Sequence, residues 1–182
     1  VSSSAQPKSK KKSPAGEDHE EKLTQGLEEI RKVRINKMNE IRDRGLNPFE
    51  YVFSQSHKAQ KLQEIYKDLE GNTEDETAKV SVAGRIMLRR VFGKLAFFTL
   101  QDDSGTIQLY MDAGRLGDAF KSLKDWTDVG DIIGVHGTIK RTEKGELSVY
   151  ATEWKMLTKA LLHLPDKWGG LKDADKRYRQ RH

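Results

Sequence analysis

The chain has 182 residues, of which 35% are hydrophobic and 34% are charged, and its 33 lysines and arginines against 28 acidic residues give a net charge of +5. This apolar content suffices for one core of ordinary domain size, and no stretch reaches the roughly 20 apolar residues that a membrane-spanning helix needs. The absence of cysteine excludes disulfide scaffolds, cysteine-ligated zinc and thiol catalysis, and the basic excess favours an anionic partner. Residues 1–16 hold a lysine run and almost no large apolar residue, so we predict a disordered basic tail there.

Residues 17–71 are predicted to form a helical N-terminal arm. Between about residues 18 and 44, apolar side chains recur every three to five positions, which predicts a long charged helix with one narrow apolar stripe. Gly45 and Pro48 mark its end, through a left-handed cap and a helix breaker. The stripe consists of Leu23, Leu27, Ile30, Val33, Met38 and Ile41. A second helix is expected over residues 56–69, and its buried side consists of Ala59, Leu62, Ile65, Tyr66 and Leu69.

From Lys79 onward the hydrophobic period changes from helical to two, which predicts strands. The first strand begins near Lys79, with a bulge or kink expected at Gly84. Four further strands are expected at residues 94–101, 106–111, 131–140 and 145–157, with a short helix capped by Asp112 between the third and fourth. Three strands, a helix and two strands are the order of the oligonucleotide-binding (OB) barrel. We therefore predict a mainly β protein, a five-stranded OB-fold barrel over residues 72–160 preceded by the helical arm; another small β-barrel is the alternative.

Alternation along the strands separates core from surface and so predicts a binding face. Phe98 shares the core side of its strand, which leaves Phe97 outside, and the next strand turns Gln108 outward, diagonally across the hairpin from Phe97. Glu146 faces outward from the last strand. The cations at the edge of this face are Arg89, Arg90 and Lys94. A ring that stacks on a base, an amide that reads its edge and cations for phosphate are typical of single-stranded nucleic-acid sites.

Two points stay open from alternation alone. The N-terminal helices offer an alternative surrounding for Phe97, in which they cover its ring. Strict alternation from Val80 places Arg90 on the inner face, unless a bulge lies near Gly84 or the strand ends before Arg90.

Several motifs are familiar as a set. They are residues 82–86 (VAGRI), Arg89-Arg90, Gly93-Lys94, Phe97, residues 99–102 (TLQD), residues 107–110 (IQLY), residues 130–132 (GDI), residues 145–148 (GELS), residues 157–161 (LTKAL), residues 164–167 (LPDK) and residues 177–181 (RYRQR). With the Arg44–Phe49 turn, this pattern resembles the anticodon-binding region of class II lysyl-tRNA synthetases over roughly residues 31–182. The Asn47-Pro48-Phe49 turn and the Arg177–Arg181 run favour the lysyl family over its aspartyl and asparaginyl relatives.

The resemblance implies a role and a set of contacts. The family attaches lysine to its tRNA with ATP; Phe97 would stack on the central anticodon uracil and Gln108 would bond its edge. Arg90 would contact anticodon base or phosphate, and Glu146 would help to read a neighbouring base. The resemblance also implies a homodimer, with a cytoplasmic location or, alternatively, a plastid or mitochondrial one.

The family's catalytic motifs do not occur in this sequence. We therefore expect residues 161–182 to lead toward a class II catalytic domain that is missing here, and this segment alone to be inactive. ATP and Mg²⁺ are expected to act only in the full-length enzyme, and the five histidines show no metal-binding spacing. The alternatives are a stand-alone OB-fold module that binds single strands without sequence preference, a dimerisation scaffold built on the helical arm, and the equivalent domain of an aspartyl- or asparaginyl-tRNA synthetase.

Overall fold

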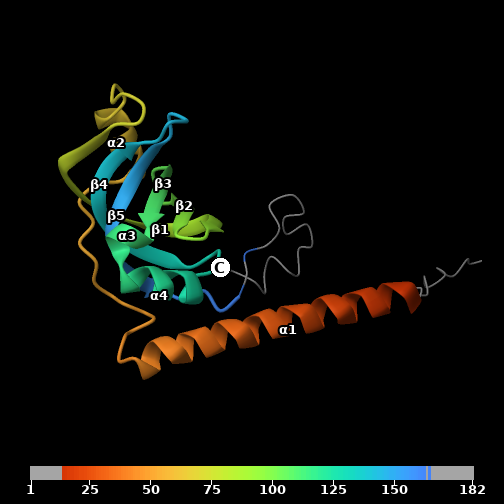
Figure 1. Cartoon of the computed structure of the whole chain (residues 1–182). Helices are drawn as coiled ribbons and strands as arrows, with labels where there is room; N and C mark the ends of the chain where they lie inside the picture. The colour runs from red at the N-terminus through yellow and green to blue at the C-terminus, as the bar shows by residue number, and fades with distance from the viewer. Residues whose placement is uncertain (1–13, 163, 165–182) are drawn as a thin grey trace, which may run out of the picture.

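The computed structural model describes residues 14–162 and 164, with side chains from Gly26 onward. A small β-barrel carries short helices at its ends, and the long helix α1 (Pro14–Asp43) runs past one end of the barrel (Figure 1). The predicted tail over residues 1–16 lies mostly outside the described residues, and α1 begins earlier than expected, at Pro14. Proline is tolerated in the first helical turn, because its lack of an N–H costs no intrahelical hydrogen bond there. The predicted linker over residues 161–182 also lies almost wholly outside the described residues.

Helix α1 ends as predicted but packs differently along its length. Gly45 has φ +75°, its N–H donates to the carbonyl of Arg42 at 2.8 Å, and the Leu46 N–H donates to the carbonyl of Ile41 at 3.1 Å. This left-handed cap satisfies carbonyls that the helix end leaves free. Of the predicted stripe, Met38 and Ile41 are buried, whereas Leu27, Ile30 and Val33 are 42–54% exposed. The apolar stripe is therefore only partly a core face, because α1 extends beyond the barrel (Figure 1).

Helix α2 (Ala59–Ile65) is shorter than the predicted span of residues 56–69. Its start is held by the turn at residues 102–104: a carboxylate oxygen of Asp102 accepts the Ala59 N–H at 2.8 Å, and the Ser104 hydroxyl accepts the Gln60 N–H at 3.0 Å. The predicted buried side holds for Ala59 and Leu62, while Ile65 is 50% exposed, contrary to expectation. Tyr66 and Leu69 follow the helix and pack partly buried against the core.

Five strands close into a barrel in the order β1-β2-β3-β5-β4, which confirms the predicted OB architecture. Their bounds are β1 Glu74–Phe92, β2 Leu95–Gln101, β3 Thr106–Asp112, β4 Ile132–Arg141 and β5 Leu147–Thr158. All neighbours are antiparallel except β3 and β5, which are parallel. β1 begins earlier than predicted, because Glu74 and Asp75 pair with Lys140 and Ile139 at the end of β4.

The irregularity in β1 lies two or three residues beyond its predicted position. The pairing with β2 shifts between Ile86 and Leu88, so that Arg89 lies opposite Phe98 and Arg90 opposite Phe97. One extra residue in a strand reverses the faces of everything that follows. The bulge therefore turns Arg90 to the outer face, which settles the conflict left by strict alternation. Gly84 instead allows β1 to pack closely against β2, since a Cβ there would lie 2.7 Å from the Gln101 carbonyl oxygen.

Two short helices lie between β3 and β4 in place of the single one expected. α3 (Ala113–Leu116) begins as predicted at Asp112, whose carboxylate accepts the Gly114 N–H at 2.8 Å. Gly117, with φ +57°, separates it from α4 (Asp118–Trp126). Leu116, Phe120 and Leu123 of these helices are buried in the core.

Asp102 ties the β2–β3 hairpin to α2 and makes folding sensitive to acid. Burial acts to raise the pKa of Asp102, but hydrogen bonds from Ala59, Ser104 and Gly105 outweigh it, so its pKa lies below the ordinary value. A carboxyl group with a depressed pKa stabilises the fold above its unfolded-state pKa of about 3.9, and this contribution is lost as the pH falls through the folded-state pKa.

We expect Asp102→Asn to lower the free energy of unfolding at pH 7 by roughly 1–3 kcal/mol, and to lose less stability than the parent between pH 5 and pH 2.5. Urea denaturation across this range measures both effects. Asp103→Asn is the matched control, because Asp103 forms an exposed ion pair with Lys58 (2.6 Å) of the kind that contributes little. Parallel stability curves for the parent and Asp102→Asn would contradict the assignment.

Candidate nucleic-acid interface

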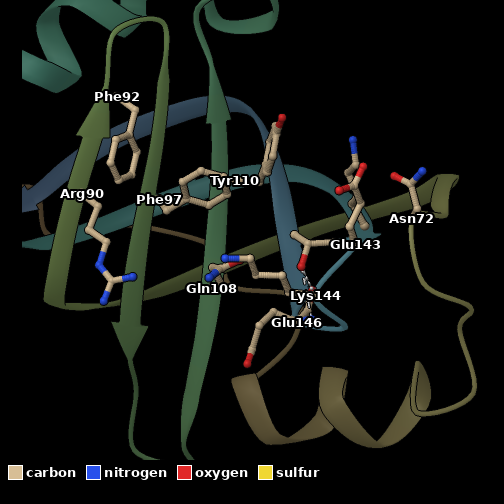
Figure 2. A pocket seen from close by; sticks show the side chains of 11 residues that line it. Asn72, Arg90, Phe92, Phe97, Gln108, Tyr110, Glu143, Lys144 and Glu146 are labelled. Atoms are coloured by element: carbon tan, nitrogen blue, oxygen red, sulfur yellow. Dashed lines mark hydrogen bonds between the residues drawn. The ribbon is translucent and has the colours of Figure 1, made fainter.

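Four aromatic rings from four neighbouring strands form a row on the outer face of the barrel. They are Phe92 of β1, Phe97 of β2, Tyr110 of β3 and Tyr150 of β5, and successive ring centroids lie 6.4, 5.1 and 4.9 Å apart. Phe97 pairs directly with Tyr110 across the hairpin, and Tyr110 pairs with Tyr150 in the parallel β3–β5 contact. Figure 2 shows the first three rings side by side. We call these four residues the aromatic row.

A pocket of about 460 Å³ opens beside the aromatic row. It gathers four of the six predicted site residues, namely Arg90, Phe97, Gln108 and Glu146. Its other lining residues are Asn72, Phe92, Tyr110, Lys140, Thr142, Glu143 and Lys144. The Arg90 and Gln108 side chains lie on the same side of the ring of Phe97 (Figure 2). The pocket thus combines ring faces with both hydrogen-bonding and charged groups, the combination suited to unpaired bases.

The structure places the other two predicted cations elsewhere. Arg89 donates to the Thr127 hydroxyl at 3.2 Å and to the Lys124 carbonyl, and its guanidinium carbon lies 5.7 Å from the ring centroid of Phe98. The structure does not bring Arg89 to this pocket, because the bulge that turns Arg90 outward directs its neighbour to the end of α4. Lys94 is exposed in the β1–β2 turn and is not among the described residues that line the pocket.

Lys140 contributes a positive charge at the β5 end of the row that sequence reasoning did not assign to the site. Its ammonium nitrogen lies 4.8 Å from the Tyr110 ring centroid and 4.9 Å from that of Tyr150. Arg115 lies over Tyr150 from another direction, 4.0 Å from the centroid, and is paired with Glu74 at 2.6 Å. Burial acts to raise the pKa of Glu74, but hydrogen bonds from Thr138 and Arg115 outweigh it and leave that pKa below its ordinary value.

An extra hydrogen bond holds the Gln108 amide in place. Gln108 and Ser148 are direct partners in the parallel β3–β5 pairing, and the Ser148 hydroxyl donates to the Gln108 carbonyl oxygen Oε1 at 2.8 Å. Ser148 is fully buried despite belonging to the outward-facing set of β5. The sequence holds no local signal for this contact, because β3 and β5 are far apart along the chain.

The turn that carries Glu143, Lys144 and Glu146 is anchored by Arg141. Its guanidinium donates to the Gly145 carbonyl at 2.7 Å and to the Tyr66 carbonyl, after α2, also at 2.7 Å. The Thr142 N–H donates to the Glu146 carbonyl at 3.0 Å and closes the turn. Glu146 is therefore presented at the pocket by a fastened turn, in the outward orientation that alternation predicts.

Within the part of the chain that the structure describes, no three histidine, aspartate or glutamate side chains are grouped so that they could hold a metal ion. Among the described helices, none is long and apolar enough to cross a membrane.

Comparison with known proteins agrees with the barrel. Residues 80–157 match the model of the tRNA anticodon family, described as an OB-fold nucleic acid binding domain. Residues 80–157 form an OB-fold nucleic acid binding domain. The closed strand order and the aromatic row lie within or next to this range, so the match and the geometry identify the same part of the chain.

Curated relatives extend the similarity to most of the chain. It is 55% identical over 163 residues to the lysine--tRNA ligase of Nostoc punctiforme, which covers 85% of this chain and 29% of that protein. It is 56% identical over 159 residues to the lysine--tRNA ligase of Thermosynechococcus vestitus (85% and 31%). It is 55% identical over 158 residues to the chloroplastic/mitochondrial lysine--tRNA ligase of Arabidopsis thaliana (85% and 26%). The chain thus spans less than a third of the length of these relatives.

Proposed function

We propose that this chain is the anticodon-binding part of a lysine–tRNA ligase. The observation that carries the proposal is the placement of the Phe97 ring and the Gln108 amide in one pocket on the outer face of the barrel. The ring offers a stacking surface and the amide offers hydrogen bonds to a base edge, the combination by which single-stranded RNA is read. Relatives that carry the name lysine–tRNA ligase support the choice of amino acid.

Each of the four predicted site residues that line the pocket has a role in this proposal. Phe97 stacks on the central uracil of the anticodon, and Gln108 hydrogen-bonds its edge. Arg90, directly across the strand pair from Phe97, contacts anticodon base or phosphate. Glu146 reads a neighbouring base from the β4–β5 turn. Lys140, beside Tyr110 and Tyr150, adds positive charge for phosphates at the β5 end of the aromatic row.

The remaining parts of the enzyme follow from this proposal. The full-length protein attaches lysine to its tRNA with ATP and Mg²⁺ on a domain outside this segment, and the segment alone is inactive. The full-length enzyme is a homodimer, which sedimentation of that protein tests. Its compartment is the cytoplasm or, as the name of the Arabidopsis relative suggests, an organelle; imaging of the tagged full-length protein in its source cell distinguishes the two.

The test of the proposal is affinity for anticodon stem-loops that differ in the central base. With a uracil-rich anticodon as reference, replacing the central uracil is expected to weaken binding roughly 5- to 150-fold, because a pocket group then loses its partner at a cost of about 1–3 kcal/mol. Fluorescence anisotropy at one fixed salt concentration measures this, since phosphate contacts make affinities strongly salt-dependent. A stem-loop with an aspartate anticodon tests the aspartyl alternative.

A second function has one observation in its favour. The aromatic row holds four rings, and such rows bind single strands regardless of sequence. If all central bases bind equally well, the chain is a non-specific single-strand-binding module and the decoding role is wrong.

A further inference from the structure

The hydroxyl of Ser148 has one proton and two acceptors within reach. The Gln108 oxygen Oε1 lies at 2.8 Å and the Glu146 carbonyl oxygen at 3.4 Å. Hydroxyl donors prefer acceptors at about 2.5–3.0 Å, so the Ser148 hydroxyl donates its hydrogen bond to Gln108. Because Ser148 is fully buried on β5, water does not compete for this bond.

This bond decides which end of the Gln108 amide meets a ligand. Its carbonyl oxygen is turned toward β5, so the amide nitrogen Nε2, which can only donate, is left for the pocket. The reverse orientation would require Nε2 to donate to the Ser148 hydroxyl. That hydroxyl would then have to donate across the longer 3.4 Å separation to Glu146.

We propose that Ser148 is a positioning residue that holds the Gln108 amide with its donor toward the pocket, so that the pocket selects a base with a carbonyl group over one with an amino group. The inference rests on the proposed function and deepens it. Uracil and cytosine differ at ring position 4, where uracil has a carbonyl oxygen and cytosine an amino group, and at N3, which donates in uracil and accepts in cytosine. We place the Gln108 donor at position 4, where it pairs with the carbonyl oxygen of uracil and meets another donor in the amino group of cytosine. An amide free to rotate would suit both.

The test compares two stem-loops that are identical except for uracil or cytosine at the central anticodon position. The ratio of the two dissociation constants is measured by anisotropy for the parent chain, Ser148→Ala, Ser148→Thr and Ser122→Ala. We expect the parent to prefer uracil about tenfold and the ratio to fall to about two for Ser148→Ala. Ser148→Thr keeps a hydroxyl, so most of the preference for uracil should return in that variant. Ser122→Ala is the matched control, because the partly buried Ser122 hydroxyl donates to the Ala119 carbonyl in α4, away from Gln108. The ratio for Ser122→Ala should equal that of the parent.

A merely structural role gives a different result. If Ser148→Ala only loosened the barrel, both stem-loops would bind more weakly by the same factor and the ratio would stay at the parent value, which would overturn the inference. Should Ser148→Ala fail to fold, Gln108→Glu provides the same test from the other partner. One carboxylate oxygen would accept the Ser148 proton and the other would present an acceptor, so the preference should move from uracil toward cytosine. An unchanged preference for uracil in Gln108→Glu would also overturn it.

The same experiment distinguishes a failure of the proposed function from a failure of the role of Ser148. A parent chain that binds neither stem-loop, or both equally, removes the decoding role and the Ser148 inference with it. A parent chain that discriminates while Ser148→Ala keeps the same ratio removes only the role of Ser148.

Discussion

Phe97→Ala is expected to weaken binding of a uracil-rich anticodon stem-loop by about 5- to 150-fold, because the stacking of one base on an aromatic side chain contributes about 1–3 kcal/mol. Phe97 is the ring that lies between Phe92 and Tyr110 in the aromatic row and that lines the pocket with Gln108. Removing it leaves Phe92, Tyr110 and Tyr150, which we expect to keep weak binding without preference for the central base. Titration of labelled RNA at constant salt measures both affinity and preference.

Tyr51→Ala is the control for this experiment. Tyr51 is 92% exposed and lies outside the pocket, so the same loss of an aromatic side chain should leave the affinity unchanged. The melting temperature of Phe97→Ala shows whether the barrel is intact, since Phe98 and not Phe97 fills its core. Equal RNA affinity of Phe97→Ala and the parent, with both folded, would contradict the placement of the site.

The second expected result concerns stability. The Lys159 side chain is fully buried, and its ammonium nitrogen lies 2.6 Å from Asp128 and 2.7 Å from Asp131. Asp128 also pairs with Lys37 of α1 at 2.7 Å, and Arg34 of α1 donates to the carbonyls of Val129, Ala160 and Leu162 at 2.9–3.0 Å. These bonds fasten α1 and the segment after β5 to the barrel. The charges of Lys159 and Asp131 are held away from water, whereas Lys37 and Asp128 are partly exposed.

We expect Lys159→Met to lower the free energy of unfolding at pH 7.5 by about 3–5 kcal/mol, because it leaves a buried carboxylate without its partner. Burial holds the pKa of Asp131 above its ordinary value even with Lys159 present, and removal of the cation should raise this pKa further. A carboxyl group with a raised folded-state pKa costs stability as the pH rises through that pKa. The deficit of Lys159→Met should therefore shrink toward pH 5, which urea denaturation at the two pH values measures.

Two variants define the control and the rescue. Lys155→Met removes a half-exposed partner of Glu50 (3.1 Å), and we expect it to cost less than about 1 kcal/mol. Adding Asp131→Asn to Lys159→Met should recover part of the loss, since it removes the unpaired charge. If Lys159→Met and Lys155→Met were equally stable, the buried ion pairs would not be what fastens these segments.

The sequence was sufficient to predict the fold and the centre of the site because both depend on local pattern. The period of two places Phe97 outside and Phe98 inside, and a short hairpin sets the register that brings Gln108 near Phe97. Asp112 and Gly45 likewise act on neighbours within a few residues, as a helix cap and a left-handed helix end. Such features are read from a few consecutive residues and need no knowledge of the rest of the chain.

The errors arose where distant segments meet. The bulge after Ile86 lies just beyond the point where β1 passes from pairing with β4 to pairing with β2, and it decides that Arg90 and not Arg89 reaches the pocket. Ile65 is exposed because the β2–β3 turn, through Asp102, fixes the position of α2. The helical period of the hydrophobic residues does not predict this contact.

By itself, the sequence determined that the chain forms an OB barrel behind a helical arm, with an aromatic and an amide on one face, because alternation and turn chemistry are local properties. The tertiary structure alone decided which cations join that face, that Tyr150 and Lys140 extend it, and that Ser148 orients Gln108. These contacts cross from β1, β4 and β5 to the β2–β3 hairpin, and their geometry is set by barrel closure and by the parallel β3–β5 pairing, to which no run of consecutive residues corresponds.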